Sequence, residues 1–350
     1  METITVQKKP VFPATYKPKT DFFDTEKGIK LVKDTFEKKL AKKLSLLRVS
    51  APRFLIVGTG LQDDLAGTQV PVSFTTKFAE SHVEVVHSLA KWKRQALGKY
   101  GFKHGQGLYT DMDAIRKDED VDETHSIYVD QWDWERIITK DERKIPFLKS
   151  IVKKIYSAIL ETEKSVEQQF PHLKARLPKE IKFIHSEELE ERFPGLTPKE
   201  RENAIAKELG ALFLIGIGHP LKSGKPHDLR AADYDDWVAE TAKGRKGLNG
   251  DIIVWDTERQ EALELSSMGI RVDKVSLLKQ LEMSGLSKRK ELEFHKAILE
   301  DRLPLSIGGG IGQSRLCMLL LQKSHIGEVQ SSVWPEDVVK EFARKGVPLL

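Results

Sequence analysis

The chain contains a single cysteine, Cys317, among its 350 residues, which excludes an internal disulfide and fits a reducing compartment. No apolar run approaches the length of a membrane span, and the N-terminal stretch METITVQKKPVFP lacks the apolar segment of a secretory signal. Basic residues exceed acidic ones only by 57 to 53, which is no electrostatic signature of nucleic-acid binding. We therefore expect a cytoplasmic protein that binds neither a membrane nor nucleic acid.

The sequence divides into a short arm and one long domain. Residues 1–24 hold three prolines and scattered lysines without apolar periodicity, so we expect a flexible N-terminal arm. Over 25–350 no linker, repeat or low-complexity tract interrupts the pattern, and a hydrophobic content of 39% suffices for a sizeable core. The sequence thus predicts a single domain over 25–350, large enough to be a catalytic domain.

Helical periodicity is clearest in three places. From Thr25 onward apolar residues recur on one helical face: Ile29, Val32, Phe36, Leu40 and Leu44. A second helix is predicted over 145–168, and a third begins after Thr197, where Pro198 and Glu200 complete a capping box. Short strand-like runs cover 70–76, 83–87, 126–135, 181–185, 211–218, 251–255 and 261–267, and a further one over 44–57 is interrupted by Pro52.

These strands do not alternate one-for-one with helices. Those at 251–255 and 261–267 are separated only by a short polar turn, as in an antiparallel pair. The fold class predicted is therefore α+β, with a mainly antiparallel β-sheet flanked by helices.

The segment IGGGIGQSRL, residues 307–316, contains four glycines in five positions. Its spacing does not match the dinucleotide-binding fingerprint, and no lysine follows Gly312 as a P-loop requires. A glycine-rich turn before a buried helix and a backbone that approaches a ligand closely both remain open.

Polar side chains alternate with apolar ones along two of the predicted strands. Period-two alternation places Gln131, Asp133 and Glu135 on one face, opposite Trp132 and Trp134. A solvated polar face would give the same pattern.

In the strand at 261–267 the same rule places Glu264 with Ser266, opposite Leu263 and Leu265. Asp251 begins the neighbouring strand, and two carboxylates on adjacent strands can share Mg²⁺. Arginines distributed along the chain, together with separate carboxylates and glycines, are the ingredients of phosphate chemistry.

These segments resemble the signature motifs of class II aminoacyl-tRNA synthetases. GGGIGQSRL is similar to the third motif, whose arginine lies on the adenine of ATP, and AIRKDED stands where the second motif supplies an arginine for the α-phosphate. LSLLRVSAPRF resembles the first motif, which implies a homodimer through the Pro52 region. Further blocks, including EVVHSLAKWKRQ, HSIYVDQWDWER, RAADYDDW and ELSSMGIRVD, are similar to the ammonia-dependent asparagine synthetases, also called aspartate–ammonia ligases.

This resemblance implies an ATP-dependent amidation of L-aspartate by ammonia. A β-aspartyl-adenylate would form with release of pyrophosphate, and ammonia would then displace AMP to give L-asparagine. It implies that Arg116 and Arg315 are catalytic and hold ATP. Further ATP contacts would come from Glu264, Arg271, Gly308, Gly310 and Gly312, and Mg²⁺ would be held by Asp251 and Glu264. Aspartate would be bound by Ser88, Lys93, Gln131, Asp133, Asp235, Arg230 and Ser267.

Asp63 is the candidate group beside the ammonia, because an acidic side chain can attract ammonium and accept its proton. Glutamine is not the expected nitrogen donor, since amidotransfer usually requires an activated cysteine and Cys317 lies in an apolar helix.

Two alternatives share parts of this pattern. A true aspartyl- or asparaginyl-tRNA synthetase should carry an anticodon-binding domain, for which the residues before the first motif are too few. A non-catalytic relative would be expected to lose the metal carboxylates or the two arginines, yet Asp251, Glu264, Arg116 and Arg315 are all present.

Overall fold

The centre of the molecule is an eight-stranded sheet. The computed structural model describes residues 16–65, 69–78, 82–242 and 244–350. The strands lie in the order β1 (Leu46–Arg48), β5 (Gly107–Ile115), β6 (Tyr128–Ile137), β13 (Ser306–Gly312), β12 (Glu261–Ile270), β11 (Asn249–Asp256), β8 (Ala211–Ile215) and β7 (Lys182–His185). Only the outermost pairs, β1 with β5 and β7 with β8, are parallel. The prediction of a mainly antiparallel sheet in an α+β fold is confirmed.

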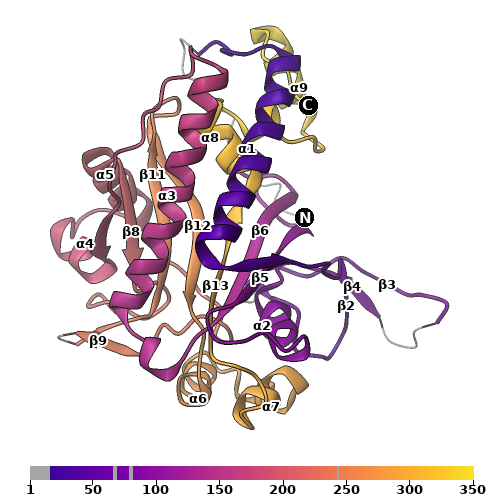
Figure 1. The fold of residues 1–350 in the computed structure, drawn as a ribbon, viewed down its shortest axis with the longest axis vertical. Coiled ribbons are helices and arrows are strands. Elements are labelled where there is room, and N and C mark those ends of the chain that lie inside the picture. Colours follow the sequence, from indigo (N-terminus) through magenta and orange to yellow (C-terminus); the bar gives the residue numbers. More distant parts are fainter. Residues whose placement is uncertain (1–15, 66–68, 79–81, 243) are drawn as a thin grey trace, which may run out of the picture.

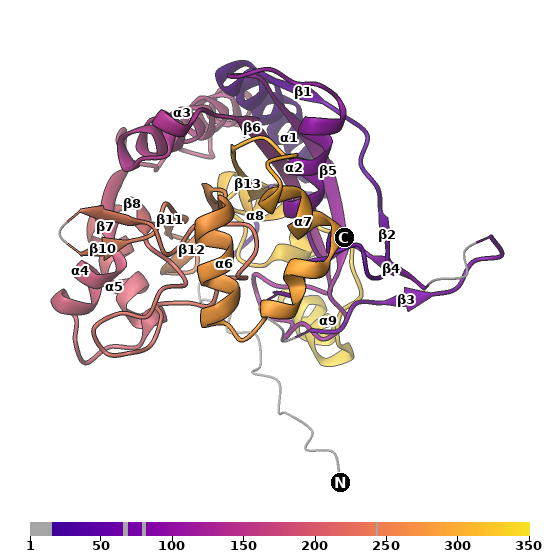
Figure 2. The same ribbon diagram turned by 90° about the horizontal axis from the view of Figure 1, so that it is seen from below.

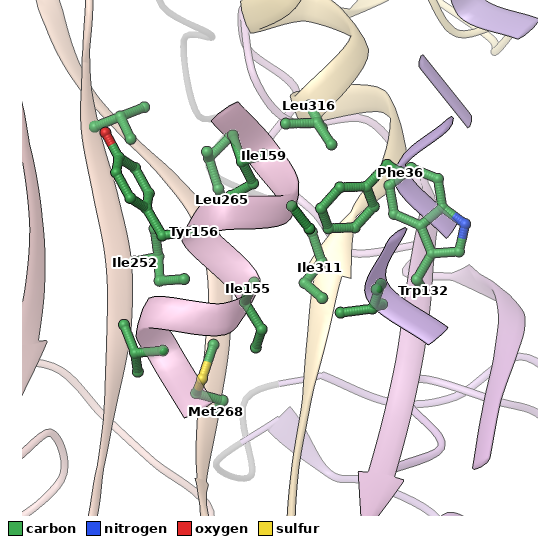
Figure 3. Close-up of a cluster of buried hydrophobic side chains, with 14 of the residues drawn as sticks. Phe36, Trp132, Ile155, Tyr156, Ile159, Ile252, Leu265, Met268, Ile311 and Leu316 are labelled. Carbon is green, nitrogen blue, oxygen red and sulfur yellow. The ribbon is translucent and has the colours of Figure 1, made fainter. Parts of the chain in front are cut away.

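One face of this sheet is covered by three helices, α1 (Phe22–Leu44), α3 (Ile145–Gln169) and α8 (Gln313–Leu320) (Figure 1). The helical stripe predicted from Thr25 is confirmed, although the helix already begins at Phe22, after an Asp21 cap. Figure 3 shows the resulting core, in which the rings of Phe36 and Trp132 lie 4.7 Å apart between centroids. The predicted helix over 145–168 is confirmed as α3, whose Ile155 and Ile159 point into the same core.

Among the described residues, helices cover the opposite face mainly at its two ends. At one end, helices α4 (Ser186–Arg192) and α5 (Pro198–Leu209) pack on β8 and β11 through a second apolar cluster. The capping box at Thr197 and Glu200 is present and begins α5 as predicted. At the other end, α2 (Ala90–Lys99) packs on β6, β13 and β5. Between these two groups of helices, parts of β6, β13 and β12 present mainly polar side chains and glycines.

Smaller elements surround this core. Strands β2 (Phe54–Ile56), β4 (Val83–Val85) and β3 (Ser73–Phe74) form a second antiparallel sheet that projects from one side (Figure 2). The run predicted over 44–57 is divided at Pro52, with β1 in the main sheet and β2 in the small one. A hairpin of β9 (Glu240–Ala242) and β10 (Arg245–Lys246), and helices α6 (Lys274–Met283), α7 (Glu293–Leu299) and α9 (Glu336–Lys345), complete the fold.

The sequence predicts a flexible N-terminal arm over 1–24 and no membrane-spanning segment. Residues 1–15 of the predicted arm lie outside the described residues, whereas the Tyr16 hydroxyl donates to Glu328 at 2.7 Å and Lys19 lies 2.5 Å from Glu258. Within the described ranges, no helix is both long and apolar enough to cross a membrane.

The glycine-rich segment forms a strand, so the alternative of a simple turn is excluded. Gly308 to Gly312 pair with Glu135 to Gln131 of β6 on one side, and Gly308 to Gly310 pair with residues 267–269 of β12 on the other. This pairing places four glycines in the middle of the sheet. Glycine weakens a strand because it has no side chain to pack, and it is often found where a ligand or another part of the protein approaches the backbone closely.

Candidate active site

A cavity of about 440 Å³ opens on the uncovered middle of the sheet. It brings together residues from segments far apart in the chain: β6, β13, β12, the start of α2, and the loops around residues 63 and 230. Most of the predicted site residues line it: Asp63, Ser88, Lys93, Arg116, Gln131, Asp133, Arg230, Asp235, Glu264, Ser267, Arg271, Gly310, Gly312 and Arg315. Asp251 and Gly308 lie next to this lining and not in it.

The glycines of β13 give room to side chains of the neighbouring strand. A Cβ on Gly310 would overlap Gln131 and would lie 2.9 Å from the Asp133 carboxylate. A Cβ on Gly308 would overlap the carboxylate of Glu135. Gly310 and Gly312 line the cavity. Gly310 makes room for Gln131 and Asp133, and Gly308 makes room for Glu135.

Lys93 and Asp133 form a buried ion pair at the base of the cavity. The Lys93 ammonium donates to Asp133 at 2.8 Å and to the carbonyl of Gly309 at 2.8 Å. Both side chains are almost inaccessible to solvent, and burial lowers the pKa of Lys93 although Asp133 opposes this. The pair supplies adjacent positive and negative groups, which suits an amino acid with a carboxylate and an ammonium group.

Arg271 is held by two carboxylates. Its guanidinium donates to Glu135 at 2.7 Å and to Asp235 at 2.5 Å, and the hydroxyl of Ser306 also donates to Glu135 at 2.7 Å. Glu135 is missing from the set of site residues implied by the resemblance, although its strand alternation places it on the same face as Asp133. The arrangement fixes the positive charge of Arg271 at the wall of the cavity.

Arg230 ties together the residues around the expected metal position. It donates to the Asp251 carboxylate at 2.6 Å and to the Ser267 hydroxyl at 2.5 Å. Ser267 lies on the same face as Glu264 and Asp251, and Ser266 also belongs to the cavity lining. Ser267 shares the face of Glu264 because of a β-bulge at Leu265, where the pairing with β11 shifts by one residue, so the strict alternation predicted for this strand is wrong beyond Leu265.

The donor set near Asp251 fits a divalent cation only in part. Burial raises the pKa of Asp251 to about 7, with Arg230 opposing and Glu264 adding to the rise. Carboxylates that repel each other in this way suit a hard cation. Among the described residues, however, no group of three or more His, Cys, Asp or Glu side chains is arranged to hold a metal ion. A Mg²⁺ ion here would need substrate oxygens to complete its shell.

Asp63 faces the cavity from the loop after β2. One of its carboxylate oxygens accepts from the Ser88 hydroxyl at 2.7 Å, and the other accepts from the backbone of Leu65 at 3.0 Å. The side chain is buried, with 2% of its surface exposed. The two predicted residues are thus brought together at one end of the cavity.

Arg315 points toward His125, which is not among the predicted site residues. Its guanidinium lies 2.8 Å from the ring of His125 and donates to the carbonyl of Glu264 at 3.1 Å. The other ring nitrogen of His125 lies 2.8 Å from Asp122. His125 also lines the cavity, and it is the first residue of the block HSIYVDQWDWER that carries the family resemblance. Arg116 lines the same cavity and lies 3.4 Å from the carbonyl of His87.

Comparison with solved structures shows a shared fold at low sequence identity. The asparaginyl-tRNA synthetase of Entamoeba histolytica superimposes with a TM-score of 0.60 and 14% identity, covering 88% of this chain and 67% of that one. An asparaginyl-tRNA synthetase of Pyrococcus horikoshii, complexed with asparaginyl-adenylate, gives a TM-score of 0.59 and 16% identity over 89% and 70% of the two chains. The chain therefore has the fold of the class II aminoacyl-tRNA synthetases.

Relatives with similar sequences identify the family to which the chain belongs within this fold. A family model described as aspartate-ammonia ligase matches residues 23–346. A protein of that name from Parabacteroides distasonis is 53% identical over 339 residues, covering 97% of this chain and 98% of the relative. Another from Clostridium tetani is 55% identical over 341 residues, covering 97% of each. The chain belongs to the aspartate–ammonia ligase family, and the enzyme predicted from the sequence is confirmed at this level.

Proposed function

We propose that the enzyme joins ammonia to L-aspartate through a β-aspartyl-adenylate, with ATP as the second substrate. The observation that carries this proposal is the convergence of Arg116, Arg315 and Arg271 with the Lys93–Asp133 pair on one cavity. Cationic groups for a triphosphate and paired charges for an amino acid are then within one site. The solved complex of the Pyrococcus horikoshii synthetase with asparaginyl-adenylate supports the same kind of intermediate.

In the first step an oxygen of the aspartate side-chain carboxylate attacks the α-phosphorus of ATP. The bond from that phosphorus to the bridging oxygen breaks, and pyrophosphate leaves. Arg116 stabilises the charge that develops on the α-phosphate, while Arg315 covers the adenine. Lys93 and Ser88 bind carboxylate groups of aspartate, and its ammonium group is received by Gln131, Asp133 and Asp235. Displacement of Lys93 from Asp133 by the substrate would leave each charge with a new partner.

Magnesium belongs to the same proposal. Asp251 and Glu264 would hold the ion, Ser267 and Arg230 lie beside them, and the ion would neutralise phosphate charge when bound. Gly310 and Gly312 leave the backbone of β13 accessible to the nucleotide. Arg271 would act by its charge on the wall of the cavity, since Glu135 and Asp235 fix its position.

In the second step ammonia attacks the activated β-carbonyl carbon, and AMP leaves with the bonding electrons. Ammonium must first lose a proton, and Asp63 is the proposed acceptor. The buried Cys317 is unsuited to release ammonia from glutamine, since burial raises the pKa of its thiol to about 12. Free ammonia is therefore the proposed nitrogen source.

A homodimer completes the proposal. Phe54 and Ile56 of β2 are about half exposed, and Phe74 of β3 packs edge-on against Phe54 at 5.2 Å on the same projecting sheet. Exposed aromatic and aliphatic side chains grouped in this way are typical of a protein interface. The adjoining Pro52 region is where the resemblance to the first synthetase motif places the dimer contact.

The decisive experiment measures pyrophosphate and asparagine together. We expect pyrophosphate release that requires aspartate, ATP and Mg²⁺, and asparagine formation that additionally requires ammonia. Release of ADP and phosphate in place of AMP and pyrophosphate would contradict an adenylate. Transfer of labelled aspartate to tRNA would favour the synthetase activity of the structural neighbours.

A further inference from the structure

A buried charge cluster lies behind the cavity and outside its lining. The carboxylate of Asp233 lies 3.0 Å from the Lys91 ammonium, 3.0 Å from the His295 ring and 3.1 Å from the Arg289 guanidinium. Arg289 also forms an ion pair with Asp64. The side chains of Asp233 and His295 are fully buried, whereas those of Arg289 and Asp64 at the edge of the cluster are partly exposed. Burial alone would raise the pKa of Asp233, but its three partners lower it well below the usual value.

Three members of this cluster, Lys91, Asp233 and Asp64, lie next to cavity residues in the chain. Lys91 precedes Lys93 on helix α2, and Asp233 precedes Asp235 in the loop that also carries Arg230. Asp64 directly follows Asp63, the proposed proton acceptor. The cluster thus connects the aspartate-binding part of the site to the loop on the ammonia side.

The loop before Asp63 rests on α7 and the short 3-10 helix Ser287–Glu291 that carries Arg289. The backbone of Phe294 donates to the carbonyl of Thr59 at 3.3 Å. A Cβ added to Gly60 would lie 3.0 Å from Leu292 and from His295, so the chain passes close to α7 at this point. Leu61 packs into the apolar cluster around Phe294. Among the described ion pairs, the one between Arg289 and Asp64 joins the 3-10 helix to this loop, and Asp64 is the residue next to Asp63.

We propose that Arg289 is a positioning residue for the nitrogen half of the reaction, because it joins Asp64 to Asp233 and so holds Asp63 against the aspartate-binding segments. This inference rests on the proposed adenylate pathway and on the role proposed there for Asp63. Arg289 itself is absent from the cavity lining. We therefore expect Arg289 to affect the position of the Asp63 carboxylate during the attack of ammonia, and not the binding of ATP or aspartate.

The test uses Arg289→Met in the full-length enzyme, with two separate measurements. Aspartate-dependent exchange of labelled pyrophosphate into ATP reports the first step, and ammonia-dependent asparagine formation reports the second. We expect the exchange rate to stay within about twofold of wild type, while kcat/KM for ammonia falls roughly 10- to 100-fold, the range for a small misplacement of a catalytic group. Arg289→Lys, which retains one donor, should recover part of this loss.

Matched variants separate positioning from general stability. Lys288→Met removes an exposed charge from the same 3-10 helix and should leave both measurements unchanged. Asp64→Leu breaks the same ion pair from the other side, and should show the same selective loss even if Arg289→Met does not fold. Because both act on one contact, the double variant should be no worse than the worse single variant.

The outcomes distinguish this inference from the function on which it rests. Equal loss of exchange and asparagine formation in Arg289→Met and Asp64→Leu, or no loss in either, would overturn the positioning role. Absence of pyrophosphate exchange in the wild-type enzyme would instead overturn the adenylate pathway, and the inference with it.

Discussion

The ammonium group of Lys93 donates to the carbonyl of Gly309 and to the carboxylate of Asp133, each at 2.8 Å. This one side chain connects helix α2 to two neighbouring strands of the sheet, β13 and β6. An added Cβ on the next residue, Gly310, would overlap Gln131 and lie 2.9 Å from the Asp133 carboxylate. The glycine-rich strand therefore leaves room for the Lys93–Asp133 pair.

The first prediction concerns Gly310. Gly310→Ala should reduce turnover at least ~100-fold, because the added methyl group would displace Gln131 and Asp133 from the geometry of the site. Overpacking at this buried strand should also cost about 1–3 kcal/mol of stability. Asparagine formation and urea unfolding measure the two effects.

Gly195→Ala is the matched control, since nothing lies within 4 Å of a Cβ at that position. Retention of wild-type turnover by Gly310→Ala would show that the close packing on β13 is unimportant for the reaction.

The second prediction separates the two half-reactions at Asp63. Asp63→Asn keeps the size of the side chain but removes its capacity to accept a proton. We expect pyrophosphate exchange to persist, while ammonia-dependent turnover falls roughly 100-fold or more, as for loss of a general base. Rapid-quench measurement of the adenylate, with ammonia added afterwards, checks this directly. The role of Asp63 as proton acceptor has to be abandoned if the variant keeps both exchange and full turnover.

Part of this site follows from local sequence patterns. Period-two alternation along β6 correctly separates Gln131 and Asp133 from the tryptophans of the core. The alternation along β12 fails at Leu265, because one extra residue in the strand turns Ser267 to the side of Glu264. A bulge depends on the pairing with β11, and periodicity within a single strand does not reveal that pairing.

Local sequence patterns likewise do not predict ion pairs between residues that are far apart in the chain. Arg271 and Glu135 are 136 positions apart, and they meet only because β13 brings β12 and β6 onto its two sides. The contact between Arg289 and Asp64 spans 225 positions. The residues that surround the substrate are thus more accessible to sequence reasoning than those that hold them in place.

The third prediction concerns the homodimer. Phe54→Asp places a charge in the exposed aromatic pair with Phe74, and should weaken the dimer at least ~30-fold, the factor that corresponds to about 2 kcal/mol at an interface centre. Light scattering across a dilution series measures the change in mass. Val275→Asp, at an even more exposed apolar residue on α6, should leave the dimer intact. Equal dissociation of both variants, or of neither, would place the interface elsewhere.

The last prediction concerns acid sensitivity near the C-terminus. His325 is buried between Trp334 and Phe342, with ring centroids 4.9 and 4.6 Å away, and its Nδ1 accepts from the backbone of Gly327 at 3.0 Å. Burial lowers the pKa of His325 to about 4, well under its ordinary value. Between these two pKa values the unfolded chain binds more protons than the folded one, so stability rises with pH and is lost on acidification.

Lowering the pH from about 7.5 to about 5 should therefore reduce the free energy of unfolding by about 2 kcal/mol through protonation of His325 in the unfolded chain. Urea-unfolding curves at the two pH values measure the loss in wild type and in His325→Gln. The variant is expected to be less stable at the higher pH, because the ring packing is gone, but to lose about 2 kcal/mol less on acidification. His172→Gln, at an exposed histidine, should retain the wild-type pH dependence. An unchanged pH dependence in His325→Gln would mean that the buried ring is not the group responsible.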